Sequence, residues 1–269
     1  MAGAKLSKLI NVELHCHTVF SKDGLMDFDG LISTAQAVGL DALAITDHDT
    51  VEGALEFRRL AASRGLRLQI IVGEERTLSD GSHLIGLFLE APIQSTELTD
   101  VLREIESQGG VVMIPHPFRK KDGLLRDGLE RLELFKNRTA GFELFSAKCS
   151  YAENQRAREL LGSSLSPFGG SDAHYECDLG ESLNVIAWQD DLKTSLLRML
   201  QRKLPFQILG KVQAQGAGER AYAPLYYRIK KFMKLPRPLL PLAKQAYRCY
   251  RNTRHGIGRK PLVEVYAHQ

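Results

Sequence analysis

The amino-acid sequence predicts an α/β barrel with a basic C-terminal extension. Strand-like and helix-like segments alternate about seven times over residues 12–202. The strand-like segments are short apolar runs without polar alternation, which is typical of a parallel sheet covered by helices. An open doubly wound sheet would give the same alternation. The polar residues favour the closed barrel, because they follow many different strands at their C-terminal ends, where α/β barrels assemble active sites.

Apolar spacing and capping residues assign the first elements. The first strand is expected over residues 12–17, and a loop containing Lys22-Asp23-Gly24 follows it. Asp29 is the expected N-cap of the first helix, which Gly39 ends. The next expected elements, in chain order, are a strand over 41–46, a helix over 51–63, a strand over 66–72 that ends at Gly73-Glu74-Glu75, and a strand over 84–89 that His83 opens.

The alternation continues through the second half of the predicted barrel. The remaining expected elements are helices over 95–108, 124–135, 151–161 and 192–202, and strands over 111–114, 141–145 and 183–188, with residues 167–170 leading into Ser171-Asp172-Ala173-His174. From Lys211 onward the alternation stops. We therefore predict a barrel domain over residues 1–209 and a separate extension over residues 210–269.

A pair of histidines ends the first predicted strand. The side-chain period of two places His15 and His17 on one face and Cys16 on the other, so both imidazoles could bind one cation. A lone His-x-His is weak evidence, since a histidine at a strand end is often only hydrogen-bonded. Companions at later strand ends strengthen the metal hypothesis.

Nine imidazole and carboxylate side chains form this recurring set. They are His15, His17, Asp23, His48, Glu75, His83, His116, Asp172 and His174. Ligands of this kind without thiolate suit Zn²⁺, Mn²⁺ or Fe²⁺ and argue against a cysteine-rich structural zinc site. Nine ligands are too many for one ion, but they suffice for two or three divalent ions with positions open for water and substrate.

Composition limits the class of protein. The 269 residues are 43 % apolar, which is enough for a sizeable core. The four cysteines form no C-x-x-C pair, so free thiols in a reducing compartment are expected. Residues 1–11 carry no apolar block of signal-peptide length, and no later run approaches about 18 apolar residues. A cytoplasmic location without a transmembrane segment is therefore expected.

The positive charge is concentrated in the extension. Residues 210–269 hold 13 Lys and Arg against 2 Asp and Glu, a net +11, which leaves 23 against 30, a net −7, for residues 1–209. Tyrosines and Phe232 are interleaved with these cations. Such a segment could bind nucleic acid by stacking and phosphate contacts, or lie on an anionic membrane surface. It could equally pack its aromatic side chains back on the barrel.

The ordered motifs resemble those of the PHP (polymerase and histidinol phosphatase) superfamily of metal-dependent phosphoesterases. The motifs, in chain order, are E-L-H-C-H-T, K-D-G, A-I-T-D-H-D-T, G-E-E, G-S-H, P-H-P-F-R and G-S-D-A-H. The resemblance covers roughly residues 10–190 and is specific as a set. It implies a distorted (β/α)₇ TIM-like barrel with a trinuclear metal centre on its C-terminal face.

The resemblance also implies roles for individual residues. One ion would be held by His15, His17, Glu75 and Asp172, a second by Glu75, His83 and His116, and a third by Asp23, His48 and His174. Arg119 matches a family arginine that contacts the phosphate. The chain departs from the family at Glu13, where Asp is common, and in a loop before Asp23 that is one residue longer than in many relatives.

A hydrolytic function follows from these features. The leading hypothesis is a metal-dependent phosphoesterase that cleaves a phosphomonoester, a nucleotide or an oligonucleotide end by attack of a metal-bridging hydroxide. The candidate catalytic residues are Arg119, Asp172 and His174. Two alternatives are a nucleic-acid or membrane binding module with a vestigial metal site, and a hydrolase of C–N bonds, since polynuclear barrels also perform that chemistry.

Overall fold

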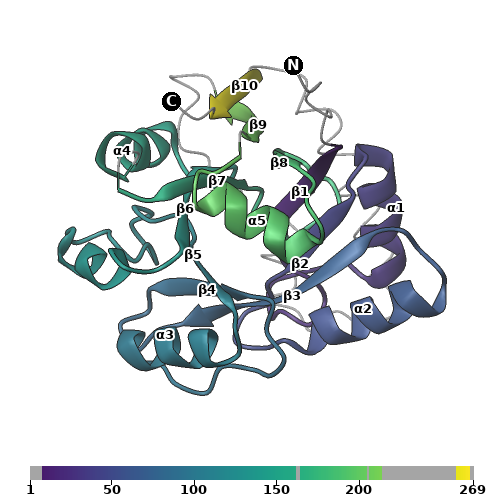
Figure 1. The fold of residues 1–269 in the computed structure, drawn as a ribbon, viewed down its shortest axis with the longest axis horizontal. Helices are drawn as coiled ribbons and strands as arrows, with labels where there is room; N and C mark the ends of the chain where they lie inside the picture. Colours follow the sequence, from purple (N-terminus) through teal and green to yellow (C-terminus); the bar gives the residue numbers. More distant parts are fainter. Residues whose placement is uncertain (1–7, 162–163, 205, 214–258, 267–269) are drawn as a thin grey trace, which may run out of the picture. The chain divides into compact units, whose positions relative to one another are not determined.

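The predicted α/β barrel is confirmed. The computed structural model describes residues 8–161, 164–204, 206–213 and 259–266 (Figure 1). The described residues up to Gly210 belong to one compact unit, and the barrel lies in it. The predicted division at residue 209 stays a prediction. Residues 214–258, which carry the interleaved tyrosines and cations, lie outside the described residues.

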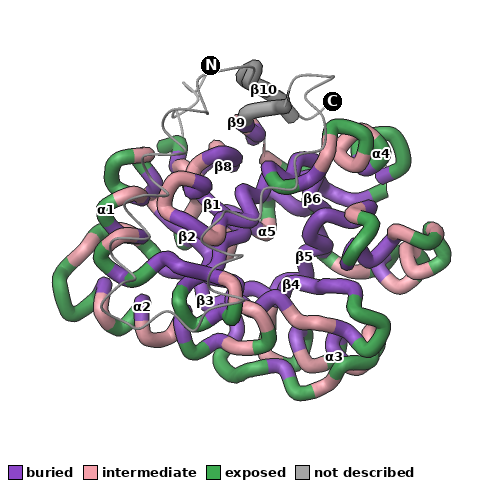
Figure 2. The backbone as a smooth tube through the Cα atoms, turned by 180° about the vertical axis from the view of Figure 1, so that it is seen from behind, coloured by how far each residue is buried: buried purple, intermediate pink, exposed green. Residues whose placement is uncertain are grey.

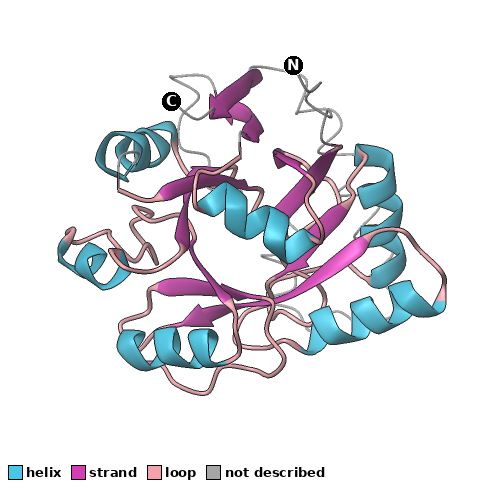
Figure 3. Cartoon of the chain, viewed as in Figure 1, coloured by secondary structure: helices cyan, strands magenta, loops and turns pink. Residues whose placement is uncertain are grey.

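The strands form the inner wall and most helices lie outside it (Figures 1 and 3). The first half of the chain contains β1 (Leu9–Cys16), α1 (Phe28–Val38), β2 (Ala42–Ile45), α2 (Glu52–Ser63), β3 (Gln69–Thr77), β4 (His83–Leu87), α3 (Leu98–Ser107) and β5 (Val111–Ile114). The second half contains the 3₁₀-helix η1 (Glu130–Phe135), β6 (Ala140–Ser146), α4 (Tyr151–Leu161), β7 (Ser166–Gly170), β8 (Ser182–Ala187), α5 (Leu192–Leu200), β9 (Phe206–Gln213) and β10 (Arg259–Tyr266).

The sheet is nearly closed and mixed. Its order from β9 is β9-β8-β1-β2-β3-β4-β5-β6-β7. Strands β1–β2, β2–β3, β5–β6 and β6–β7 pair in parallel, whereas β3–β4, β4–β5, β1–β8 and β8–β9 are antiparallel. The side-chain amide of Asn184 in β8 links β7 to β1, because its nitrogen donates to the backbone carbonyls of Gly169 in β7 and Val12 in β1. The strands are buried while the outer faces of the helices are exposed (Figure 2).

Helix α5 covers the N-terminal ends of two strands. The Ser166 hydroxyl at the start of β7 donates to the carbonyl of Leu200, and the Leu200 side chain lies against Gly141 at the start of β6. This packing fills one end of the barrel and leaves the polar strand ends at the other. In the described residues, every helix is too short or too polar for a membrane span.

The apolar runs predict an all-parallel sheet, and this prediction is wrong in part. Strand β3 does not end before Gly73-Glu74-Glu75 but continues to Thr77, and the turn after it reverses the chain into β4. Gly81 takes a φ of 77° in that turn, and the Asp80 carboxylate accepts the N–H and O–H of Ser82. Both strands are buried on both faces, so apolar content alone could not show that they form a hairpin.

Two further expectations about elements are corrected, and two strands were not expected. The helix expected over 124–135 is only the short η1, because the preceding backbone bonds elsewhere: Leu125 N–H donates to Pro117 and Gly123 N–H donates to Arg119. The N-cap of α1 is Asp27 rather than Asp29, and its carboxylate accepts the N–H of Gly30 at 3.0 Å. Strand β9, which runs through Lys211, and strand β10, which lies within the extension, were not expected. The predicted end of the alternation at Lys211 stays a prediction, because residues 214–258 lie outside the described residues.

Candidate metal centre

All nine predicted ligands lie at one end of the barrel. Strand β1 supplies His15 and leads to His17, and both backbones bond the segment after β7: His17 N–H donates to Ala173 and Ala173 N–H donates to the carbonyl of His15. These bonds bring the His-x-His pair beside Asp172 and His174. Cys16 points away from the centre, where its thiol donates to the carbonyl of Ala44. It takes no part in the cluster, as predicted.

The first ligand group comprises His15, His17, Glu75 and Asp172. Five separations among His15 Nε2, His17 Nε2, Glu75 Oε2 and Asp172 Oδ1 lie between 3.1 and 3.5 Å. An ion with tetrahedral bonds of about 2.0–2.1 Å separates its ligand atoms by about 3.3–3.4 Å. The two imidazole nitrogens, together with either carboxylate oxygen, therefore have the mutual spacing of ligands around one ion.

Glu75 also belongs to a second group. Its Oε1 lies 3.0 Å from Nδ1 of His83 and 2.9 Å from Nε2 of His116, while its Oε2 faces the first group. The carboxylate thus has one oxygen toward each group, which is the arrangement of a bridging ligand. His83 opens β4, and because β4 runs antiparallel to β3 its first residue lies at the same end as the C-terminal ends of the parallel strands.

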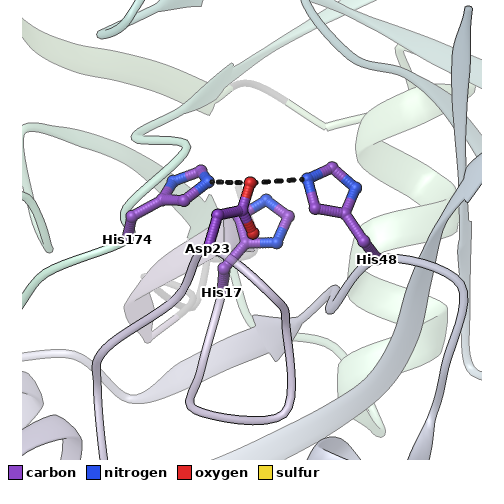
Figure 4. Close-up of side chains that lie close together, drawn as sticks. All are labelled: His17, Asp23, His48 and His174. Atoms are coloured by element: carbon purple, nitrogen blue, oxygen red, sulfur yellow. Dashed lines mark ion pairs between the residues drawn. The ribbon is translucent and has the colours of Figure 1, made fainter. Parts of the chain in front are cut away.

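The third group lies beside the first and contains Asp23, His48 and His174. Asp23 Oδ2 is 3.3 Å from Nε2 of both histidines (Figure 4). The ring of His17 stacks on that of His48 with centroids 4.6 Å apart. The loop that carries Asp23 is held by Ser21, whose hydroxyl accepts the N–H of His48 and lies 3.2 Å from Nδ1 of His17. These contacts fix the loop, so Asp23 lies beside His48 and His174 although the loop before it is one residue longer than in many relatives.

Glu143 contacts a histidine of the first ligand group and one of the second, and the sequence did not lead us to predict it. Its Oε1 is 2.7 Å from Nδ1 of His15, and its Oε2 accepts the backbone N–H of His116 at 2.6 Å. The first bond directs Nε2 of His15 toward the ligand group. The second holds His116 at a φ of 27°, a strained conformation. A Cβ at Gly170 would come within 1.8 Å of Oε1, so this site requires glycine. The sequence signal for Glu143 was that a charged residue interrupts the apolar run F-E-L-F.

Glu13, the predicted departure from the family, supports the same strand end. Its Oε1 accepts the N–H groups of Leu14, His15 and Ser171 at 3.0–3.1 Å. The side chain is fully buried, and burial raises its pKa to about 7 despite these bonds. Glu13 therefore orients the backbone of β1 and of the segment after β7, and it does not enter the ligand groups.

Arg119 reaches the centre from the loop after β5. Its Nη1 donates to Asp172 Oδ2 at 2.6 Å, and its Nε donates to Asp122 Oδ1 at 2.5 Å. Asp122 is buried and was not predicted; its backbone carbonyl also accepts the N–H of His83. A guanidinium fixed at two points beside Asp172 is placed to meet an anionic group at the centre.

The electrostatics of the centre fit divalent cations. Burial opposes protonation of His15, but the carboxylates of Glu143, Glu75 and Asp172 outweigh it and raise its pKa well above the usual value. Burial raises the pKa of Glu75, but surrounding histidines lower it well below its usual range. Among the predicted ligands, Glu75 Oε2 is buried, faces the first ligand group and accepts no hydrogen bond. A buried polar atom without a hydrogen bond is costly, and cation binding would satisfy this one.

Metal affinity is expected to rise with pH. Burial disfavours the His48 cation, but Glu75 and Asp23 raise its pKa from 6.5 to about 9. Its charged form stabilises the metal-free protein below about pH 6.5, and that contribution is lost as the pH rises through 9. An ion requires neutral imidazole, so apparent affinity should increase by about one log unit per pH unit for each proton displaced. Competition with a chelator between pH 6.5 and 9 measures this slope, and a flat profile would contradict it.

Comparison with known proteins gives the family. A family model described as the PHP domain matches residues 13–169, more than half of the chain. The uncharacterised protein MJ1587 of Methanocaldococcus jannaschii is 28 % identical over 149 residues, which cover 51 % of this chain and 82 % of that protein. An error-prone DNA polymerase of Symbiobacterium thermophilum is 47 % identical over 74 residues, which cover 27 % of this chain but only 7 % of the polymerase.

A solved structure shares the fold. The lesion-specific endonuclease PfuEndoQ of Pyrococcus furiosus superposes with a TM-score of 0.56 at 13 % identity, over 72 % of this chain and 56 % of that one. At this identity the likeness concerns the fold. The family model carries the assignment, because it begins at Glu13 and includes the segments that hold seven of the nine predicted ligands, from His15 to His116. The protein belongs to the PHP domain family.

Proposed function

We propose that this protein is a metal-dependent phosphoesterase that hydrolyses a phosphomonoester, a nucleotide or an oligonucleotide end. The single observation that carries the proposal is the first ligand group, in which the imidazole nitrogens of His15 and His17 have ligand spacing to each other and to the carboxylate oxygens of Glu75 and Asp172. Family membership supports it. The similarity to a DNA polymerase and to a lesion-specific endonuclease favours substrates with phosphoester bonds.

The proposed ligand assignment follows the three groups. His15, His17, Glu75 and Asp172 would hold one ion, Glu75 with His83 and His116 a second, and Asp23 with His48 and His174 a third. Clustered divalent ions of Mn, Fe or Zn supply a water of lowered pKa and neutralise charge on a phosphoryl group. Imidazole and carboxylate donors suit these metals.

The chain's own residues supply orientation and charge. The guanidinium of Arg119 would bind phosphoryl oxygens beside Asp172 and stabilise the charge that develops there. The Nδ1–H of His174 donates to the backbone carbonyl of Asp172 at 2.8 Å, which turns its Nε2 toward Asp23. Asp172 divides its carboxylate between the first ligand group and Arg119. It would therefore position the phosphate-binding arginine relative to the ions.

The alternatives receive less support. A cationic Arg119 beside the centre favours an anionic substrate over a neutral C–N bond. A vestigial site would have lost some of its ligands, whereas all nine side chains are present and close together. Binding of nucleic acid or an anionic surface by residues 210–269, and a cytoplasmic location, stay predictions.

The test combines elemental analysis with activity on a panel of phosphoesters. Purified wild-type protein with added Mn²⁺ is expected to contain about two or three ions per chain and to release phosphate or nucleotide from at least one class of substrate. Asp172→Ala should lose activity and metal together. Release from no member of the panel, or full activity and metal in the variant, would refute the proposal.

A further inference from the structure

A second cation lies beside the metal centre. Lys148 follows β6, in the turn between that strand and α4. Strands β5, β6 and β7 pair in parallel, so Arg119, Lys148 and His174 follow adjacent strands at the same end of the barrel. The turn is fixed by its backbone: Ala147 N–H donates to Gly170 and Cys149 N–H donates to Ser146. Lys148 therefore stands on a rigid support.

The ammonium of Lys148 is held in place but remains accessible. Its Nζ donates to Asp178 Oδ2 at 2.6 Å and lies 5.9 Å from the ring centroid of Tyr175. Asp178 is buried, whereas 33 % of the Lys148 side chain is exposed. The same Asp178 oxygen lies 3.4 Å from the backbone nitrogen of His174, which donates to it. An ammonium has three N–H donors, and this ion pair uses one of them.

The position of Lys148 relative to the ligands points to a role beyond neutralising Asp178. The Asp178 oxygen that accepts from its ammonium also accepts the backbone N–H of His174, so one carboxylate oxygen links Lys148 to the third ligand group. Arg119 approaches the centre from the β5 loop and is already bound to Asp122 and Asp172. A phosphate at the centre would have Arg119 on one loop and Lys148 on the next.

We propose that Lys148 forms a second anion subsite, which binds a phosphodiester group adjoining the scissile phosphate. This inference rests on the proposed function and names its substrate class: an oligonucleotide end rather than a small phosphomonoester. A single phosphate bound at the metal centre requires only one anion subsite. A nucleic-acid end presents a further negative charge one nucleotide away, and a fixed, accessible ammonium beside the centre suits it.

The experiment compares two substrates that differ in this second anion. One is p-nitrophenyl phosphate, and the other is a 5′-phosphorylated dinucleotide. Lys148→Gln is expected to lower kcat/KM roughly 10-fold for the dinucleotide and less than about 2-fold for p-nitrophenyl phosphate. Lys148→Arg should keep most of the activity on both. The dependence of log kcat/KM on log salt concentration should become shallower by about one unit for the dinucleotide only.

Two further variants make the result decisive. Lys136→Gln removes a cation that also forms an ion pair, with Glu133 at 2.6 Å, but stands just before β6, at the opposite end of the barrel. This variant should leave kcat/KM unchanged for both substrates. Lys148→Gln combined with Asp178→Asn removes both charges of this ion pair and should reproduce the loss if the single variant folds poorly. An equal loss on both substrates, or an unchanged dinucleotide rate, would overturn the subsite.

Failure of the proposed function would be recognised separately. If the wild type hydrolyses neither substrate, fluorescence anisotropy with a fluorescein-labelled 5′-phosphorylated dinucleotide still tests the subsite. Roughly 10-fold weaker binding in Lys148→Gln, with Lys136→Gln unchanged, would support an anion subsite on a protein that is not a phosphoesterase. Equal binding by the wild type and Lys148→Gln would overturn it.

Discussion

Glu75→Gln is expected to reduce kcat by about 10³-fold or more, which corresponds to about 4 kcal/mol of transition-state stabilisation. Glu75 Oε1 lies about equally close to His83 and His116, while its Oε2 lies among the first ligand group. An amide keeps the shape but has only one oxygen and no negative charge. At least one ion should be lost with the activity, and elemental analysis of the purified variant measures that loss.

The adjacent residue provides a matched control. Glu74 is also buried in β3, but its carboxylate faces the other way and accepts the N–H of Ile93 at 2.9 Å. Burial raises its pKa to about 7, so its neutral form costs little at physiological pH. Glu74→Gln should keep both metal and activity. Equal losses in the two variants would mean that the effect comes from β3 folding and not from ligation.

Arg119→Ala is expected to lower kcat/KM by about 10²–10³-fold, the usual effect of removing a preorganised donor to developing charge. The bound metal should change little, because Arg119 contacts Asp172 through Oδ2 while Oδ1 faces the histidines. Arg119→Lys should recover only part of the rate, since an ammonium lacks the planar fork. Steady-state kinetics together with metal content on the same samples would separate phosphate binding from ligand loss.

Arg126 offers the control for this substitution. It stands in the same connection and has an acidic partner, with Nη2 at 3.6 Å from Asp80 Oδ2, but it contacts none of the ligands in the described residues. Arg126→Ala should alter kcat/KM less than about 2-fold. If Arg119→Ala behaved like Arg126→Ala, Arg119 would be a solvated surface residue with a structural ion pair only, and the phosphate-binding role would be wrong.

The sequence by itself determined which side chains could meet and roughly where. Helix α4 has the predicted bounds, because a run of helix formers begins after Ser150 and ends near the glycine that follows it. The two histidines of β1 share a face because strand period is a local property. Strand-end positions of His48, His116 and Asp172 were likewise visible, because each follows a short apolar run.

The tertiary structure decided everything that depends on contacts between distant segments. The direction of β4 places His83 in the centre, and no local pattern encodes it, since both faces of β3 and β4 are buried. Glu143 is 128 residues from His15, and Asp178 is 30 residues from Lys148. Their roles come from closure of the barrel, which brings the ends of β1, β5, β6 and β7 together. The periodicity of the sequence predicts on which face of a strand or helix a side chain lies, whereas only tertiary packing decides which residues contact that face.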